Sequence, residues 1–401
     1  MKRIAIALAA VGLALAGSVS AQKKYDTGAS DTEIVIGQTM PYSGPASAYG
    51  SLGRTMVGYF NKINDQGGIN GRKIKIISLD DGYVPAKTLE NTRRLVEQDE
   101  VLVVAGSVGT PTNSAVHAYL NQKKVPQLFV NTGAGKWNDP KNFPWTTGWS
   151  PTYPLEGRVF VEHILRTNPN AKIAILYQND DFGKDYLRGV RERLGDKAKA
   201  MLVGEASFEV TDATVDSQIL SLKATGADTF ITAASPKFAS QTIRRIAEAG
   251  WKPTHYMTNV SSTIGSVLQP AGLERAVGLM TTQFLKDPSD KQWENDPAMV
   301  EYKEFMKKYF PGGDPNDQLN LQAYGVAQSV VYVLKTAGDN LTRDNLQKIA
   351  TNLKDVRIAV TLPGLMLETS PTDYGPLSTV VMARFDGQKW TTFGEPISGN
   401  R

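Results

Sequence analysis

A run of small and hydroxyl-bearing residues, Gly106–Thr110, could carry chemistry because it follows an apolar stretch and precedes a helical pattern. Two kinds of chemistry fit these residue types at this spacing. Ser107 between glycines resembles a variant of the G-x-S-x-G turn that exposes a catalytic nucleophile. Thr110 followed by Pro111 predicts instead the N-cap and the first position of a helix. The free backbone N–H groups of such a helix start favour a bound carboxylate or other anion.

The nucleophile interpretation is the weaker one. A catalytic triad would need His117, His163 or His255 beside Ser107, together with an acid partner. Of these histidines, one falls inside the helix after the turn, one lies among apolar helical positions and one opens a strand. Pro111 also delays the helix, which starts directly after the nucleophile in such turns. We therefore expect anion binding, with a serine hydrolase as the alternative.

Motifs for other catalytic or cofactor sites are missing from the sequence. No G-x-x-x-x-G-K-[ST] motif occurs, and no G-x-G-x-x-G follows the first predicted strand. The chain has three histidines and no cysteine, which argues against a zinc site and excludes disulfides. We therefore expect no cofactor, no metal and no enzymatic activity.

The composition is that of an exported globular protein. Of 401 residues, 41% are hydrophobic and 21% are charged, values typical of folded domains. Residues 1–21 combine Lys2 and Arg3, an apolar run and a small-residue cleavage site, which predicts a signal peptide. No later segment approaches the roughly 20 apolar residues of a membrane span, so we expect no insertion after cleavage. The periplasm is the expected location.

The charge distribution does not favour nucleic acid as a partner. The formal net charge is +4, and no cluster of lysine and arginine with interleaved aromatic residues stands out. We therefore expect no nucleic-acid partner.

Strand and helix patterns alternate through two parts of the chain. The first part has predicted strands at 33–39, 72–80, 102–105 and 127–130, and predicted helices at 48–66, 85–98 and 111–123. After an irregular crossing at 137–153, the second part has predicted strands at 171–177, 201–208, 228–233 and 255–258, and predicted helices at 182–194, 215–225 and 235–249. A return crossing at 276–297 leads to predicted helices at 298–310, 320–337 and 343–353 and a strand at 378–385.

This order predicts an α/β protein of two doubly wound, Rossmann-like lobes with parallel sheets. In such sheets a ligand binds beyond the carboxyl ends of the strands. Five loops lie at these ends, namely 41–47, 106–110, 131–135, 179–182 and 234–236. We expect them to surround one cavity, and several aromatic residues fall close to them.

Three segments carry a resemblance to a known family. They are EIVIGQTMPYSGPASAYG, FNKINDQGGINGRKIKIISLDD and the pair AGSVGT and FVNTGA. They resemble the leucine/isoleucine/valine-binding proteins, which are periplasmic substrate-binding components of branched-chain-type ABC importers. The resemblance implies two lobes joined by a three-strand hinge, a monomer, and an ABC permease with its ATPase as partners. It places the N-terminal lobe at 22–149 and 282–362, and the C-terminal lobe at 150–281 and 363–401.

The resemblance also assigns candidate ligand contacts. Thr110 matches the residue that binds the ligand carboxylate, and the loop after residue 131 matches one that supplies further contacts. Phe182 stands where the family has a tyrosine that closes over the ligand. Together with strand-end aromatic residues, the candidate ligand-binding residues are Tyr49, Thr110, Asn131, Thr132, Gly133, Ala134, Trp149, Tyr153, Phe182 and Ser235.

Two departures from the family pattern concern the ligand. Amino-acid binders of the family hold the ammonium group with an acidic side chain, but residues 256–261 contain no carboxylate, and Ser235 replaces a second-lobe tyrosine. A buried ammonium without a counter-charge costs several kcal/mol. We therefore expect a carboxylate without an α-ammonium group, either aromatic or hydrophobic. Branched-chain amino-acid binding and a ligand sensor of the same fold are the alternatives.

Overall fold

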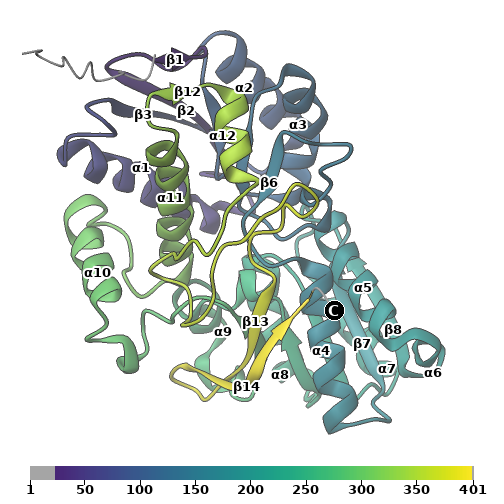
Figure 1. Ribbon diagram of the computed structural model, residues 1–401. Helices are drawn as coiled ribbons and strands as arrows, with labels where there is room; N and C mark the ends of the chain where they lie inside the picture. The colour runs from purple at the N-terminus through teal and green to yellow at the C-terminus, as the bar shows by residue number, and fades with distance from the viewer. Residues whose placement is uncertain (1–22, 400–401) are drawn as a thin grey trace, which may run out of the picture.

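A computed structural model describes residues 23–399, so the predicted signal peptide lies outside the described residues. The chain forms two α/β lobes, which occupy the upper and lower halves of Figure 1. The doubly wound, two-lobed fold expected from the sequence is confirmed. We call the lobe around the first sheet the first lobe and the other the second lobe.

The first lobe contains a parallel five-stranded sheet in the order β3-β2-β4-β5-β6. Its strands are β2 (Glu33–Met40), β3 (Lys73–Asp80), β4 (Val103–Ala105), β5 (Gln127–Val130) and β6 (Thr146–Gly148). The helices between them are α1 (Gly50–Asp65), α2 (Pro85–Glu97) and α3 (Thr110–Lys123). The strand order reverses between β2 and β4, so a crevice opens at their carboxyl ends.

The second lobe contains a seven-stranded sheet in the order β14-β13-β11-β10-β9-β7-β8. Its parallel strands are β7 (Ile173–Gln178), β8 (Leu202–Phe208), β9 (Thr229–Ala233), β10 (Thr254–Met257) and β11 (Met280–Gln283). Its antiparallel edge consists of β13 (Thr379–Phe385) and β14 (Trp390–Ser398). The helices are α4 (Tyr153–Thr167), α5 (Asp181–Leu194), α6 (Ala198–Met201), α7 (Asp216–Ala224), α8 (Pro236–Glu248) and α9 (Gln269–Ala271).

After β11 the chain returns to the first lobe. Helices α10 (Pro297–Tyr309) and α11 (Gln318–Ala337) lie beside α1 (Figure 1), and α12 (Arg343–Ala350) packs on α11. Tyr59 of α1 meets Tyr324 of α11 edge to face, with ring centroids 4.8 Å apart. Short strands β1 (Lys24–Tyr25) and β12 (Asn340–Leu341) pair beside these helices. A helix from the late part of the chain therefore completes the wall of the first lobe.

Most predicted elements lie within a few residues of their observed bounds, but several segments differ. The irregular crossing predicted at 137–153 contains β6, the edge strand of the first sheet. No helix bounds were expected for α4, which buries the apolar face formed by Leu155, Val159 and Phe160. The crossing predicted at 276–297 contains β11, a strand between β10 and β13. β14 was not predicted, because its sequence WTTFGEPIS carries glycine and proline and it pairs with β13 alone.

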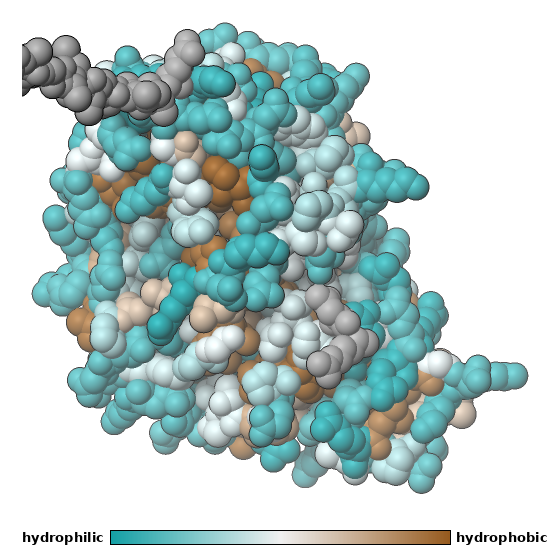
Figure 2. Space-filling model, viewed as in Figure 1, coloured by the Kyte–Doolittle hydropathy of each residue, from teal (hydrophilic) through white to brown (hydrophobic). Residues whose placement is uncertain are grey.

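Hydrophilic residues cover most of the face shown in Figure 2, with scattered hydrophobic patches between them. Among residues 23–399, no helix is long and apolar enough to cross a membrane.

Candidate ligand-binding cleft

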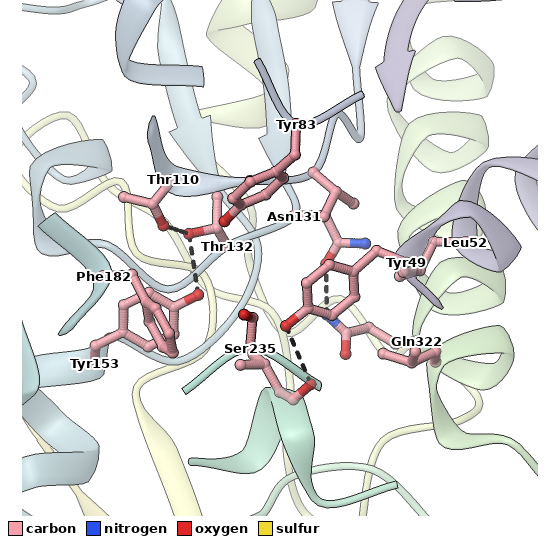
Figure 3. A pocket seen from close by; sticks show the side chains of 14 residues that line it. Tyr49, Leu52, Tyr83, Thr110, Asn131, Thr132, Tyr153, Phe182, Ser235 and Gln322 are labelled. Atoms are coloured by element: carbon pink, nitrogen blue, oxygen red, sulfur yellow. Dashed lines mark hydrogen bonds between the residues drawn. The ribbon is translucent and has the colours of Figure 1, made fainter. Parts of the chain in front are cut away.

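A cavity of about 30 Å³ lies between the lobes, where strands of both sheets end (Figure 3). The first lobe contributes Tyr49, Leu52, Tyr83, Val108, Gly109, Thr110, Asn131 and Thr132, together with Leu319 and Gln322 of α11. The second lobe contributes Tyr153, Phe182, Ser235 and Val260. Segments far apart in the sequence therefore meet around one small space.

Three hydroxyl groups form a buried cluster on one side of the cavity. The Oγ1 atoms of Thr110 and Thr132 lie 2.5 Å apart, and the Tyr153 hydroxyl donates to Thr132 Oγ1 at 3.1 Å. All three residues are at most 3% exposed. Hydroxyl groups can donate as well as accept, so this cluster can turn its protons toward a ligand oxygen.

The start of α3 differs from the sequence prediction. Helix α3 begins at Thr110, and Gly109 rather than Thr110 occupies the N-cap without a side-chain cap. The Thr110 hydroxyl therefore belongs to the cavity cluster and not to a capping hydrogen bond. Gly109 has a φ of 104°, and a Cβ there would lie 2.7 Å from the Tyr83 ring. Only glycine fits both this conformation and this close approach.

Two buried polar groups in the lining lack partners among residues 23–399. Gln322 Nε2 donates to Asn131 Oδ1, which leaves Asn131 Nδ2 without an acceptor. Ser235 Oγ has no hydrogen bond either, and its residue is 2% exposed. Buried polar groups normally find a partner. In this position the partner can be a ligand atom.

Aromatic rings form much of the remaining wall. Tyr153 packs edge to face on Phe182 with ring centroids 4.8 Å apart, and it stacks on Tyr186 at 5.2 Å. Tyr49 and Tyr83 face them across the cavity in Figure 3. The Tyr49 hydroxyl reaches the Val260 carbonyl of the second lobe at 3.5 Å. An apolar or aromatic ligand body can therefore be enclosed on several sides.

None of the fourteen lining residues carries a charge. Two carboxyl groups lie behind the wall, and burial raises the pKa of Asp180 to about 6 and that of Glu156 to about 7. Asp180 is held as the N-cap of α5, where it accepts hydrogen bonds from Gln178 Nε2 and from the Gly183 backbone N–H. The cavity therefore offers hydrogen-bond donors but no free charge.

Seven of the ten candidate residues from the sequence line the cavity: Tyr49, Thr110, Asn131, Thr132, Tyr153, Phe182 and Ser235. Gly133, Ala134 and Trp149 do not line it. Trp149 is fully buried, its Nε1 donates to Ser329 Oγ at 2.9 Å, and it packs on Phe284. A Cβ at Gly133 would lie 2.4 Å from the Pro151 carbonyl. These three residues hold the surrounding loops.

Seven lining residues were not among the sequence candidates: Leu52, Tyr83, Val108, Gly109, Val260, Leu319 and Gln322. Tyr83 lies just beyond the carboxyl end of β3, so the rule used for the other loops points to it as well. Leu319 and Gln322 come from α11, and no local sequence signal marks them as cavity residues.

The hydrolase alternative finds no triad geometry among the described residues. Ser107 is 2% exposed, and its Oγ accepts a hydrogen bond from the Thr39 backbone N–H. His117 stacks on Phe143, His163 Nδ1 bonds to Tyr256, and His255 Nε2 bonds to Thr232. No histidine of residues 23–399 is recorded in contact with Ser107. In the same range, no group of three or more His, Asp or Glu could hold a metal ion.

Comparison with known proteins identifies similar chains. A family model described as "Periplasmic binding protein" matches residues 33–389. An amino acid binding protein of Pseudomonas aeruginosa is 23% identical over 325 residues, which cover 77% of this chain and 80% of that protein. The Leu/Ile/Val-binding protein homolog 1 of Brucella suis is 25% identical over 342 residues, which cover 82% of this chain and 84% of that protein.

Solved structures share the fold. A branched chain amino acid ABC transporter structure from Thermus thermophilus with bound valine has a TM-score of 0.83 at 15% identity, covering 93% of this chain and 98% of that chain. A fatty acid ABC transporter substrate-binding protein from Thermomonospora curvata has a TM-score of 0.76 at 21% identity, covering 94% and 95%. The fold is therefore that of a type I periplasmic binding protein.

The buried Glu156 makes stability depend on pH. Because its pKa rises from 4.5 to about 7 on folding, the folded state keeps a proton that the unfolded state has lost between these values. Stability should therefore fall as pH rises from 4.5 to 7, by up to about 3 kcal/mol. Glu156→Gln keeps an oxygen that can accept from Thr282 and removes the ionisation. We expect this variant to lose less stability than the native protein between pH 5 and pH 8, measured by urea unfolding.

The control for this measurement is Glu90→Gln, an exchange of the same type at an exposed position. It should leave the pH dependence of the native protein unchanged. Equal slopes for the native protein and Glu156→Gln would show that Glu156 does not hold a proton in the folded state.

Proposed function

Because the chain belongs to the periplasmic binding protein family, we propose that it captures a small carboxylic acid without an α-ammonium group and delivers it to an ABC permease. It is a substrate-binding protein by family and fold, and the family implies the periplasm. The finer proposal, an aromatic or hydrophobic acid, rests above all on the uncharged cavity lining with its hydroxyl cluster.

The carboxylate end of the ligand would lie at Thr110 and Thr132. The Thr110 hydroxyl stands at the start of α3, where the helix dipole favours negative charge, and the Thr132 hydroxyl lies beside it. Hydrogen bonds to a charged group are roughly twice as strong as neutral ones. An ammonium group would find no such compensation, since the lining offers it no carboxylate and Asp180 is already held by its own donors.

The names of similar proteins are compatible with this ligand class. The structure from Thermus thermophilus holds valine, whereas the protein from Thermomonospora curvata is named for fatty acids, which have no ammonium group. Proteins with this fold are therefore named both for a ligand with an ammonium group and for ligands without one. The side chains in this cavity favour the second kind.

Capture would proceed by closure of the two lobes. We propose the lobe boundaries 22–149 with 282–362 and 150–281 with 363–401, and the place of β13 and β14 in the second sheet supports them. Contacts across the cleft include Lys136 Nζ to Asp181 Oδ2 at 2.9 Å and the Gly135 N–H to Asp185 Oδ2 at 2.7 Å. A ligand shifts the lobes toward closure only by binding the closed form better.

Matched pairs of acids test the ligand class. Each pair differs only in the amino group: 4-methylpentanoate with leucine, and 3-phenylpropanoate with phenylalanine. At 100 times its dissociation constant a ligand adds about 2.7 kcal/mol of stability, which a thermal shift detects. We expect at least one acid without an amino group to raise the melting temperature more than its amino-acid partner. A larger shift with leucine and phenylalanine would contradict the proposal.

Removal of the Thr110 hydroxyl tests the carboxylate anchor. Thr110→Val keeps the shape of the side chain and removes one hydrogen bond to a charged group, worth about 1.5–3 kcal/mol. We expect the affinity for the best-binding acid to fall by about tenfold or more, measured by calorimetric titration. Thr92→Val is the control in the same lobe, because the Thr92 hydroxyl is buried without a partner and lies outside the cavity. Equal affinities for Thr110→Val and the native protein would exclude Thr110 as the anchor.

Removal of the Lys136–Asp181 ion pair tests closure. Both side chains are partly exposed, so the pair contributes little, and Asp181→Asn should weaken ligand binding by up to about fivefold. The effect should shrink in 1 M salt, where exposed charges are screened. Asp31→Asn removes an exposed pair with Lys23 outside the cavity lining and should leave the affinity unchanged. An equal effect of the two variants would mean that the contact does not act on closure.

A further inference from the structure

A second, smaller cavity adjoins the ligand cavity at the start of α11. Its volume is about 10 Å³, close to that of one water molecule, and it is lined by Asn259, Thr263, Gln283, Phe284, Leu285, Gln318, Leu319 and Gln322. Leu319 and Gln322 line both cavities, and Val260 of the first cavity follows Asn259 of the second. The two cavities therefore share part of their lining. We call the second cavity the amide chamber.

Four carboxamide side chains line the amide chamber: Asn259, Gln283, Gln318 and Gln322. Gln318 Nε2 donates to Gln283 Oε1, and this bond leaves Gln283 Nε2 as the free end of the amide. Gln283 is 3% exposed, and neither its Nε2 nor Asn259 Nδ2 has a partner among the described residues. The amide NH2 groups of Gln283 and Asn259 are thus buried without an acceptor, an arrangement that proteins normally avoid.

The missing partner should be an uncharged oxygen. The amide chamber has no charged residue in its lining. A carboxyl group lies directly behind it, because Glu156 Oε2 accepts from the Asn259 backbone N–H at 3.3 Å and from Thr282 Oγ1 at 2.7 Å. A second one, Asp317, caps the start of α11. A second carboxylate on the ligand would be buried there without a positively charged partner, whereas a carbonyl oxygen accepts from the amides without burying a charge.

We propose that the ligand is an elongated acid with an uncharged oxygen acceptor at its far end, and that Gln283 and Asn259 bind this acceptor in the amide chamber. This inference rests on the proposed function, since the carboxylate at Thr110 fixes the near end. The far end enters when the Gln322 side chain turns away from Asn131. Gln283 and Asn259 then determine specificity, whereas Thr110 and Thr132 recognise the carboxylate common to all acids.

The test compares acids with and without a distal carbonyl. One pair is flexible, octanoate and 7-oxooctanoate, and one is rigid, 3-phenylpropanoate and 3-(4-acetylphenyl)propanoate. Affinities are measured by calorimetric titration of the full mature protein. In at least one pair we expect the ketone to bind about tenfold more tightly than its parent, the ratio that one well-placed hydrogen bond supplies. Ratios near one in both pairs would overturn the proposal.

Two matched variants identify the donor. Gln283→Met and Gln318→Met both break the bond between these side chains, but only the first removes the unpartnered Nε2. Gln283→Met should bring the affinity ratio of the ketone pair close to one and leave the affinity for the parent acid within about twofold. Gln318→Met should keep the ratio. Equal loss of the ratio in both variants would show a structural effect and would overturn the assignment to Gln283.

The outcomes also separate this inference from the proposed function. If parent acids bind without a preference for the ketones, the inference fails and the proposed function stands. If no acid binds, the proposed function fails and the inference fails with it. Should Gln283→Met not fold, Asn259→Ser removes the second donor: a ratio below that of the native protein supports the amide chamber, and a ratio equal to a native value of about ten counts against it.

Discussion

A ligand enclosed in this cleft has to be held by hydrogen bonds and apolar contacts, because none of the lining residues carries a charge. This constraint determines what the cavity can accept. An anion can be stabilised by hydroxyl groups and by the positive end of α3, since both present hydrogen to it. A buried cation would need acceptors with negative charge, and the two carboxyl groups behind the wall hold protons more readily than usual because they are themselves buried.

The fold meets this constraint by bringing together segments that are distant in the sequence. The carboxyl ends of parallel strands place Thr110 and Thr132 side by side, and α4 of the other lobe brings the Tyr153 hydroxyl to them. Helix α11 then closes the opposite side after the chain has crossed both lobes. The hydroxyl cluster therefore spans both lobes, since two of its members belong to one lobe and the third to the other.

Local patterns in the sequence predicted most parallel strands of the two sheets and several residues of the cavity lining, but not β6, β11 or β14. The alternation of strands and helices predicted both lobes, and the turn at Gly109 and Thr110 pointed to residues that line the cavity. The N-cap was wrong by one residue, because glycine at positive φ can start a helix that the Thr-Pro pair indicated one position later. Trp149 was assigned to the cavity from its place near a strand end, but its ring turns into the core toward Ser329. Side-chain direction at a loop is set by packing, which periodicity does not encode.

The residues that no sequence pattern marked are those of the opposite wall. Leu319 and Gln322 lie on a long helix whose apolar positions predict only that it is buried. The hydrogen-bond partners of Gln322, Asn131 and Ser150, lie more than a hundred residues away in the sequence. Asn131 shows why this wall matters, because its amide oxygen is occupied by Gln322 while its Nδ2 remains free. The hydrogen bond between Gln322 and Asn131 thus links the strand-end loop to α11. A ligand that accepts a hydrogen bond from the free donors beside this bond would connect both walls of the first lobe with the proposed closure of the second lobe.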